Sequence, residues 1–357
     1  MKRKINAGIL GCGQIAQIMH LPYLHDLDGF NIHSLCDISR ETVEKVGVKY
    51  QVPAEKLFTD CDLFLTDPDL DAVFICSKDH CEPAVKAANA KKHIFVEKPF
   101  GFSLAEAEKM ADAAEANNVK LMVGYMKRYD TGFDFARNQI NNMTNISMVK
   151  IHDFGGSFSY TKNVFDVITG SDIPEAVLLE GKEKTNAAML SEIGGDRKHL
   201  LGAYSLLLGV FSHDLVLMRH LFGNEPKILF ADVYKNSFTT AVLRFGDIEC
   251  VLESGLVMKR SIWDESITVY SDLVNLSLVF PWPYLKNAPS KVYICDNAEG
   301  TDSPRESVVS ASFHEAYRSE LMHFYECIVN DSEPITSGRD AVHDIRLAGE
   351  IIRAVPV

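Results

Sequence analysis

The feature that most constrains the fold is a glycine-rich turn between a short apolar run and a helical pattern. The apolar run covers Ile5–Leu10, and the sequence GCGQIA follows at once at positions 11–16. Glycines at the first and third positions permit a tight turn and leave the backbone exposed, while the start of the next helix offers free N–H groups to an anion. The arrangement predicts a strand–turn–helix unit that binds the phosphates of a dinucleotide.

The rest of the first 125 residues alternates short strand-like runs with helical patterns. A helix is predicted over Ser103–Asn117, with Ser103 and Glu106 forming a capping box. Such alternation is typical of a doubly wound parallel sheet, so we expect an α/β fold with a Rossmann domain at residues 1–125. The further predicted strands are Phe30–Cys36, Ala72–Cys76, His93–Val96 and Lys120–Val123.

After residue 146 the pattern changes to successive strand-like runs joined by turns. This pattern predicts a second, α+β domain at residues 126–357 with a mainly antiparallel sheet, closed by helices over Ser312–Val329 and Asp340–Val355. The stretch from Gly155 to Leu200 has no clear periodicity and is left unassigned. The predicted strands are Ser147–Phe154, Ile228–Tyr234, Thr239–Phe245, Glu249–Ser254, Ser266–Tyr270 and Asn275–Val279.

Composition excludes several classes of function. The 357 residues include 36 basic and 49 acidic side chains, a net charge of −13 that argues against nucleic-acid or anionic-membrane partners. The eight cysteines contain no C-x-x-C pair, so we expect no metal site and a reducing, cytoplasmic location. Leu200–Ser212, the longest uncharged apolar stretch, is too short to span a bilayer. Gly11 and Gly13 interrupt the apolar start, which favours a first strand over a secretory signal.

An acidic residue ends the second predicted strand, where the adenosine ribose lies in dinucleotide-binding folds. Asp37 would accept hydrogen bonds from the ribose hydroxyls, and its charge would repel a 2′-phosphate. We therefore favour NAD as cofactor, although Ser39 and Arg40 offer partners to a phosphate and leave NADP open. The alternative is that the glycines only form a turn and that Asp37 is solvated.

The segment KHIFVEKP at 92–99 is a strand that ends in two opposite charges. Ligands of a doubly wound sheet collect beyond the carboxyl ends of its strands, so Glu97 and Lys98 are expected at the cofactor crevice. An ammonium group beside a hydroxyl that loses hydride and proton stabilises the developing alkoxide. The alternative is an ordinary solvated ion pair.

Taken together, these motifs resemble the glucose-fructose oxidoreductase, inositol dehydrogenase and rhizopine-catabolism (Gfo/Idh/MocA) family. The alanine-containing helix after His80 and the segment GYMKRYD at 124–130 add to the likeness. The resemblance implies bound NAD or NADP, a second domain with a large open-faced sheet, and oxidation or reduction at a hydroxyl of a sugar, glycoside or cyclitol. It also implies dimers or tetramers built through that sheet.

The chain departs from the family after its fourth predicted strand, where CSKDH at 76–80 replaces the usual Thr-Pro pair. We expect this altered loop near the nicotinamide ribose. The predicted cofactor-binding residues are Gly11, Cys12, Gly13, Gln14, Ile15, Asp37, Cys76, Ser77, His80, Glu97, Lys98 and Arg128.

A helix bracketed by Gly209 and Gly223 carries His213. From the residues alone, a histidine among apolar neighbours is more often a core residue than a catalytic one. The resemblance instead implies that His213 is the proton acceptor that works with Lys98, and that Asp214 orients it or contacts substrate. The family pattern D-x-x-x-H has Gly209 here in place of the aspartate, which changes the division of work.

Several other side chains are weaker candidates. Arg128 and Tyr129 line the cleft or form a domain junction, and Tyr160 is an alternative proton donor. His220 and the two tryptophans, Trp263 and Trp282, are interpreted as structural or subunit-contact residues.

Three hypotheses about function remain. The first is a dehydrogenase that transfers hydride between nicotinamide and a secondary hydroxyl, with Lys98 and His213 handling the proton. The second keeps NAD tightly bound through a transient oxidation that leads to elimination, epimerisation or glycoside cleavage. The third is a non-catalytic, NAD-binding regulator, which the presence of both Lys98 and His213 disfavours.

Overall fold

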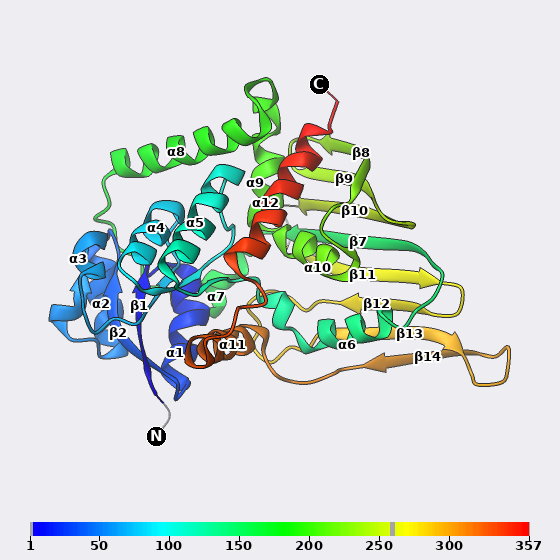
Figure 1. The fold of residues 1–357 in the computed structure, drawn as a ribbon, viewed down its shortest axis with the longest axis horizontal. Helices are drawn as coiled ribbons and strands as arrows, with labels where there is room; N and C mark the ends of the chain where they lie inside the picture. The colour runs from blue at the N-terminus through cyan, green and yellow to red at the C-terminus, as the bar shows by residue number, and fades with distance from the viewer. Residues whose placement is uncertain (1–2, 258–260, 357) are drawn as a thin grey trace. The chain divides into compact units, whose positions relative to one another are not determined.

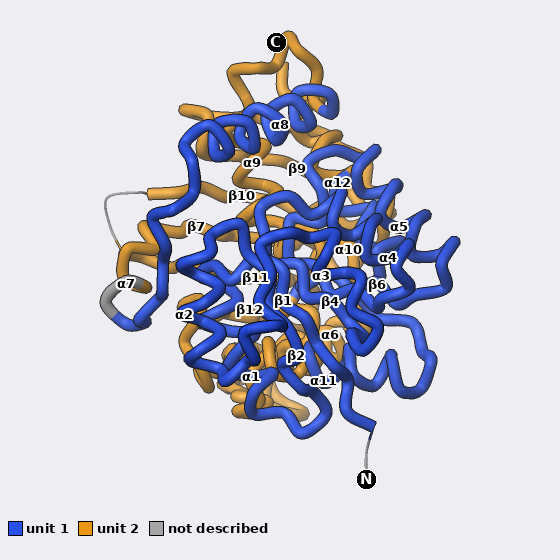
Figure 2. The backbone as a smooth tube through the Cα atoms, turned by 90° about the vertical axis from the view of Figure 1, so that its left-hand side faces the viewer, with its two compact units in different colours: residues 1–125, 162–192, 320–345 blue, residues 126–161, 193–319, 346–357 orange. Residues whose placement is uncertain are grey.

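The computed structural model describes residues 3–257 and 261–356 and divides the chain into two compact units. Figure 2 colours the two units separately. Unit 1 consists of residues 1–125, 162–192 and 320–345, and unit 2 of residues 126–161, 193–319 and 346–357.

The centre of unit 1 is a six-stranded parallel sheet with the order β3-β2-β1-β4-β5-β6. This is the strand order of a Rossmann fold: successive strands are added on one side of β1 up to β3, and on the other side from β4 onward, so the topological switch point lies between β1 and β4. The predicted parallel sheet is therefore confirmed, and the two-residue β3 is an addition that is too short to leave a pattern. The strands are β1 (Ile5–Leu10), β2 (Phe30–Cys36), β3 (Leu57–Phe58), β4 (Ala72–Ile75), β5 (His93–Val96) and β6 (Leu121–Val123).

Helices follow the strands of unit 1 in the expected alternation. The capping box of α5 differs from the prediction by one residue: Ser103 Oγ accepts from Glu106 N at 3.3 Å, whereas Glu106 Oε2 accepts from Phe102 N at 2.8 Å. The helices are α1 (Leu21–Asp26), preceded by the π-helical turn η1 (Ala16–His20), α2 (Arg40–Tyr50), the 3₁₀ turn η2 (Ala54–Lys56), α3 (Cys61–Leu65), α4 (Cys81–Asn89) and α5 (Leu104–Asn117).

Unit 1 also recruits helices from later in the sequence. In α11 (Ala316–Asn330), the ring of Phe324 packs at 5.6 Å from that of Phe74 and at 5.7 Å from that of Phe95, both on the parallel sheet. Within the stretch left unassigned from the sequence, α8 (Glu175–Ile193) is a long helix; its Glu192 accepts a hydrogen bond from Leu104 N at 2.7 Å. α7 (Thr161–Val164) and α12 (Gly338–Arg353) cross the unit boundaries.

Unit 2 is built on an eight-stranded sheet with the order β14-β13-β12-β11-β7-β10-β9-β8, which Figure 1 shows side by side. Every pairing is antiparallel except β7 with β10, so the prediction of a mainly antiparallel sheet is confirmed. Two strands, β13 and β14, were not predicted. The strands are β7 (Ile146–Gly156), β8 (Lys227–Tyr234), β9 (Phe238–Phe245), β10 (Ile248–Val257), β11 (Trp263–Ser271), β12 (Asn275–Val279), β13 (Lys291–Asn297) and β14 (Pro304–Val309).

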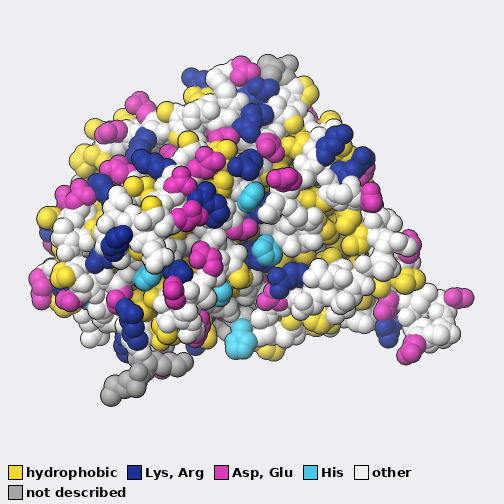
Figure 3. All heavy atoms as spheres, viewed as in Figure 1, with side chains coloured by type: hydrophobic (Ala, Val, Ile, Leu, Met, Phe, Trp, Pro, Cys, Tyr) yellow, Lys and Arg dark blue, Asp and Glu magenta, His cyan; other side chains and the backbone are white. Residues whose placement is uncertain are grey.

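Two of the helices in unit 2 are largely buried. α9 (Leu201–Gly209) is followed by α10 (Ser212–Phe222), which ends at Gly223 with a φ of 115°. Among the described residues, no single helix has the length and apolarity to cross a bilayer; one pair bent by 63°, Gly195–Gly209 with Ser212–Phe222, meets that test by length and composition only. The remaining helical segments are η3 (Met126–Tyr129), α6 (Thr131–Ile140), η4 (Phe158–Tyr160) and η5 (Gly195–Leu200). On the face drawn in Figure 3, acidic and basic side chains are interspersed.

Candidate active site

The glycine turn after β1 has the geometry that the fingerprint predicts. Gly11 has a φ of +93°, and a Cβ there would lie 2.4 Å from Ser77 N, so only glycine fits this close approach to the loop after β4. A Cβ on Gly13 would meet nothing within 4 Å. Gly13 and Gln14 are exposed, and the half-buried Ile15 precedes the helical turn η1 as its N-cap residue. The turn therefore leaves an open, N–H-lined cradle that suits a pyrophosphate.

Asp37 is held at the end of β2, next to that turn. Its Oδ2 accepts from Cys12 N at 2.7 Å and its Oδ1 from Ser39 N at 2.8 Å. The side chain is only partly buried. Two backbone donors thus fix the carboxylate beside the glycine turn, where the ribose of an adenosine lies in this fold.

The altered loop after β4 joins the same edge of the sheet. Cys76 and Ser77 contact Gly11, as described above, and Ser77 Oγ donates to Asp79 O at 2.8 Å. His80 is buried, and its Nδ1 lies 2.7 Å from Pro99 O. Burial lowers the pKa of His80, and the Pro99 carbonyl oxygen can only accept, so Nδ1 carries the proton of this hydrogen bond. His80 therefore ties the loop after β4 to the loop after β5.

Glu97 and Lys98 lie at the carboxyl end of β5. Glu97 is buried, and its Oε1 lies 2.6 Å from His20 Nε2, while its Oε2 accepts from Lys98 N at 3.1 Å. Burial alone would raise the pKa of Glu97, but the hydrogen bond from His20 and the nearby charges hold it below its usual value. Glu97 is therefore an anchored carboxylate, whereas Lys98 beside it is only partly buried.

In unit 2, α10 presents His213 and Asp214 in its first turn. His213 is 7% exposed and Asp214 is fully buried. Asp214, Asp153 on β7 and Glu265 on β11 bring carboxylate oxygens within 4.8 Å of one another. Because Asp153 and Glu265 are paired across β7 and β11, the sheet register itself creates this group.

One lysine partly neutralises the three buried acids. Lys127 forms an ion pair with Glu265, and Trp263 Nε1 donates to the other oxygen of Glu265 at 2.9 Å. The ammonium also lies 4.8 Å from the centre of the Phe280 ring. If all three acids were ionised, their negative charge would exceed the positive charge of Lys127 in a buried place. Protonation of a carboxylate lowers this electrostatic cost.

The pKa directions agree with that charge balance. Burial, aided by Glu265, raises the pKa of Asp214 to about 7. Burial likewise raises the pKa of Asp153 well above its usual value. Both buried carboxyl groups therefore favour the protonated form more strongly than exposed acids do.

The structure gives the remaining candidates structural contacts. The guanidinium of Arg128 lies 5.4 Å from the centre of the Phe133 ring and is buried. Tyr160 donates its hydroxyl to Pro283 O at 2.8 Å, burial raises the pKa of its phenol to about 12, and its ring meets that of Trp282 edge-on at 5.5 Å. These contacts favour packing roles for Tyr160 and both tryptophans.

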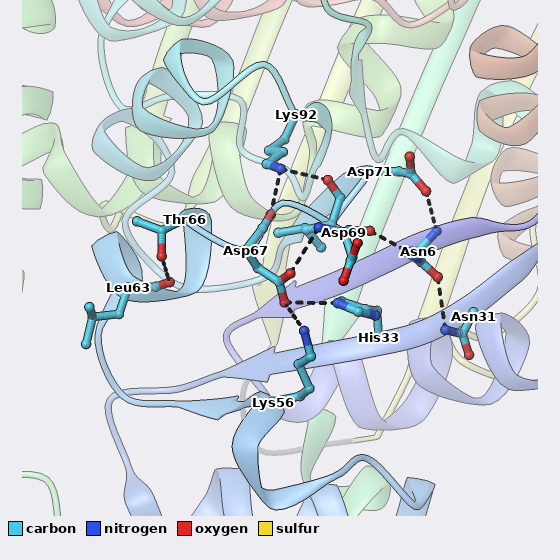
Figure 4. A network of polar contacts seen from close by, with 11 residues as sticks. Asn6, Asn31, His33, Lys56, Leu63, Thr66, Asp67, Asp69, Asp71 and Lys92 are labelled. Carbon is cyan, nitrogen blue, oxygen red and sulfur yellow. Dashed lines mark hydrogen bonds and ion pairs between the residues drawn. The ribbon is translucent and has the colours of Figure 1, made fainter.

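A second polar network lies at the opposite edge of the parallel sheet. Asp67, in the turn before β4, accepts from Lys56 Nζ at 2.7 Å, His33 Nε2 at 2.9 Å and Asp69 N at 3.1 Å (Figure 4). Lys92 Nζ donates to the carbonyl oxygens of Asp67 and Leu70, each at 2.8 Å. Because these groups precede β4 and β5, the network braces the sheet and lies away from the glycine turn.

The sequence did not reveal which side chains contact the predicted site residues. It did not find His20 as the partner of Glu97, nor Asp153, Glu265 and Lys127 around Asp214. The strand pattern held a signal for two of them: Asp153 shares the inward phase of β7 with Val149 and Ile151, and Glu265 shares that of β11 with Ile267 and Val269. An acid in an apolar phase predicts a buried polar cluster.

Comparison with known proteins assigns the first unit. Residues 5–125 match the family model GFO_IDH_MocA, described as an oxidoreductase family with an NAD-binding Rossmann fold. Over these residues, about a third of its length, the chain is similar to this family. The predicted resemblance is confirmed, and the open cradle at Gly13 fits the dinucleotide that the family description names.

Relatives of known activity match over different lengths. The myo-inositol 2-dehydrogenase of Thermotoga maritima is 33% identical over 143 residues, which cover 38% of this chain and 41% of that protein. The scyllo-inositol 2-dehydrogenase (NAD(+)) of Bacillus subtilis is 22% identical over 97% of this chain and 93% of its own. The first of these alignments therefore spans less than half of the relative.

The solved structures extend the likeness of fold to both units. The aldose-aldose oxidoreductase of Caulobacter crescentus, solved with glycerol, matches with a TM-score of 0.73 and 20% identity. The match covers 99% of this chain and 97% of that one. The two-sheet architecture is thus shared beyond the Rossmann domain.

Proposed function

We propose that the protein is an NAD-dependent dehydrogenase that acts on a secondary hydroxyl of a sugar, glycoside or cyclitol. The observation that carries the proposal is the position of Lys98. Lys98 follows β5 at the same sheet edge as the glycine turn and Asp37, beyond the carboxyl ends of the strands. Ligands of a doubly wound sheet bind at that edge.

The dinucleotide would be held by the residues already described in unit 1. The N–H groups after Gly13 face the pyrophosphate, and Asp37 accepts from the ribose hydroxyls. The loop formed by Cys76, Ser77 and His80 lies beside the turn. When bound, the nicotinamide ring supplies the hydride acceptor.

The protein's own groups manage the proton. Oxidation of a CH–OH group removes a hydride from carbon and a proton from oxygen, so the alkoxide character that develops needs a nearby cation. Lys98 supplies that charge, and His213 takes the proton directly or through water. Asp214, the buried residue that follows His213 in the first turn of α10, orients His213 or contacts the substrate.

Cofactor choice follows from the charge at the end of β2. Asp37 offers two oxygens that are already held by Cys12 N and Ser39 N. A carboxylate accepts from two ribose hydroxyls but repels a 2′-phosphate, which favours NAD over NADP.

The substrate class has support from the relatives. Two of them act on inositols by name, and the structural neighbour from Caulobacter crescentus is named for aldoses. All of these substrates are polyhydroxylated. We also propose a homo-oligomer formed through the eight-stranded sheet of unit 2, which the resemblance to the family implies.

The proposal is tested by turnover of a panel of sugars and cyclitols with NAD⁺, followed by absorbance of NADH. We expect Lys98→Met to lower kcat by at least about 100-fold while NAD⁺ still binds, because removing an electrostatic stabiliser of the reacting oxygen costs that much. Lys109→Met is the matched control, since Lys109 is exposed on α5. Unchanged kcat in Lys98→Met would remove the proposed role.

His213 needs a separate comparison on its own helix. We expect His213→Asn to lower kcat by about 10² to 10⁴-fold, the usual contribution of a general base. His220→Asn, two turns along α10, should leave kcat within about twofold. Equal losses in the two variants would mean that the helix has been disturbed and that His213 has no special role.

A retained cofactor is the second candidate, and one observation favours it. The backbone of residues 165–172 is hydrogen-bonded to the side chain of Gln17, in the first turn after the glycines, and to that of Thr42, at the start of α2. A segment in that place slows exchange of a dinucleotide. Stoichiometric release of NADH into solution during polyol oxidation would contradict the retained-cofactor cycle, whereas product formation without NADH release would support it.

A further inference from the structure

A segment outside the nucleotide-binding motifs is hydrogen-bonded to both sides of the acid at the end of β2. We call residues 165–172 the strap. At its first end, Gln17 and Ile168 exchange two hydrogen bonds, each of 2.8 Å, between the amide side chain and the backbone. Gln17 Nε2 also donates to Cys12 O at 2.7 Å. The strap is thereby fixed to the glycine turn itself.

The second end of the strap is fixed to the first turn of α2. Gly170 N donates to Thr42 Oγ1 at 2.9 Å. The carboxylate of Asp172 accepts from Ser39 Oγ and, at 3.1 Å, from Glu41 N. The hydrogen bond from Ser39 lowers the pKa of Asp172, so this side chain is charged at neutral pH.

The approach of the strap to α2 depends on glycine. A Cβ on Gly170 would lie 2.2 Å from Ser39 Oγ and 2.8 Å from Asp172 Oδ1. A side chain here would therefore push the strap away from α2. This close fit and the six hydrogen bonds of the two ends, which include a longer one of 3.4 Å from Ser171 N to Glu41 Oε2, hold the strap in one conformation.

Asp172 accepts hydrogen bonds from the donors that a phosphate at this position would use. A 2′-phosphate on the adenosine ribose would project past Asp37 toward the start of α2, where a hydroxyl and free helix N–H groups are its natural partners. Ser39 supplies that hydroxyl and Glu41 one of those N–H groups, and both are bound to Asp172. Arg40, the nearby cation, instead lies 3.4 Å from Glu44 and from Thr59.

We propose that Asp172 is a specificity-determining residue that excludes NADP by placing a second carboxylate, besides Asp37, at the 2′-phosphate position. This inference rests on the proposed function, because it assumes a dinucleotide in the glycine turn. Asp37 belongs to the fold's own motif, whereas Asp172 is about 130 residues away in sequence and arrives only through the strap. The phosphate meets two like charges and has lost its hydrogen-bond donors.

The test measures the affinities of the full-length, nucleotide-free protein for NAD⁺ and NADP⁺ by isothermal titration calorimetry. Asp172→Asn keeps the size of the side chain and an oxygen acceptor but removes the charge. We expect it to improve the affinity for NADP⁺ by about tenfold, or about 1.4 kcal/mol, and to change that for NAD⁺ by less than about twofold. Asp166→Asn, an exposed acid of the same strap, is the matched control and should change neither.

Asp37 alone can keep NADP⁺ binding too weak to measure, so the same comparison is made in an Asp37→Asn background. There Asp172→Asn must again improve NADP⁺ binding relative to NAD⁺. 2′,5′-ADP and 5′-AMP serve as smaller probes of the same difference, with 2′,5′-ADP expected to gain and 5′-AMP to stay unchanged.

The outcomes separate this inference from the function on which it rests. NAD⁺ binding with an unchanged NADP⁺/NAD⁺ ratio in both backgrounds would overturn the role of Asp172 and leave the dehydrogenase proposal intact. Equal gains for both cofactors would also overturn it, because that result means only that the strap has loosened. Failure of the wild-type protein to bind either dinucleotide would refute both.

Discussion

Asp67 gives the sharpest test of the energetics of the Rossmann unit. Its carboxylate is 7% exposed and accepts from Lys56, His33 and Asp69 N (Figure 4). Burial alone would raise the pKa of Asp67, but these hydrogen bonds and the charge of His33 lower it from 3.8 to about 2. The ionised form is therefore strongly favoured by the fold.

The size of the effect follows from linkage between pKa and folding. A shift from 3.8 to about 2 corresponds to roughly 2 kcal/mol at 1.36 kcal/mol per unit. Because the folded pKa is the lower one, this stabilisation is complete above about pH 5 and is lost as the pH falls toward 2. At pH 3 about half of it remains.

The assay is urea unfolding of the full chain, followed by circular dichroism at pH 7 and pH 3. We expect Asp67→Asn to lower the free energy of unfolding by about 2 kcal/mol at pH 7 and by about half as much at pH 3. Asp69→Asn is the control, since the exposed Asp69 uses only its backbone in this network. A pH-independent difference, or an equal loss in Asp69→Asn, would refute the reasoning.

Three further predictions concern the turn and the buried acids. Gly11→Ala should lower the free energy of unfolding by about 1–3 kcal/mol, because Gly11 has a positive φ and a Cβ there would clash at 2.4 Å. Gly13→Ala should keep the melting temperature of the free protein but lose much of the increase that NAD⁺ causes. A similar loss of stability in both variants would contradict this contrast. Lys127→Met removes the ammonium group from a buried acid cluster, so urea titration at pH 7 should show a loss of about 3–5 kcal/mol; a loss below about 1 kcal/mol would mean that the acids are already neutral. Asp214→Asn should flatten the decline in stability between pH 5 and 8, since a group whose folded pKa is raised to about 7 favours folding less as the pH rises; parallel pH profiles for variant and wild type would count against the raised pKa.

The parallel sheet could be predicted from the sequence because its central strands are short and largely buried. Strands such as Ala72–Ile75 appear as uninterrupted apolar runs, and the glycine turn fixes the register of the first strand–helix pair. In contrast, β14 begins at Pro304 and has no buried residue, so it lacks the alternation that reveals a strand. It forms only as an edge partner of β13.

The long helix α8 was missed for a related reason. Its apolar residues do not gather on one face; Val177, Leu178 and Leu179 follow one another and are all about half exposed. Helical periodicity is a signal of burial on one side, so a helix without that asymmetry gives no pattern. Contacts such as Glu192 with Leu104 N hold it, and those depend on tertiary structure.

The residues of the candidate site also differ in whether the sequence alone points to them. Residues within one local motif, such as Gly11, Gly13 and Lys98, could be proposed as site residues because the chemistry and the backbone turn occur together in sequence. Asp172 could not, since its position depends on a segment that returns to α2 from far along the chain. A local motif can therefore propose a site, whereas a residue that reaches the site through long-range contacts leaves no such motif.

The central claim is that Lys98 and His213 act on the same substrate hydroxyl. A crystal structure of the complete chain with NAD⁺ and a bound polyol measures this directly. The account predicts that Lys98 Nζ and a ring nitrogen of His213 both lie within about 3.2 Å of one substrate oxygen, or reach it through one water. A complex in which the two groups face different cavities, or in which either is sealed from the polyol, would contradict it.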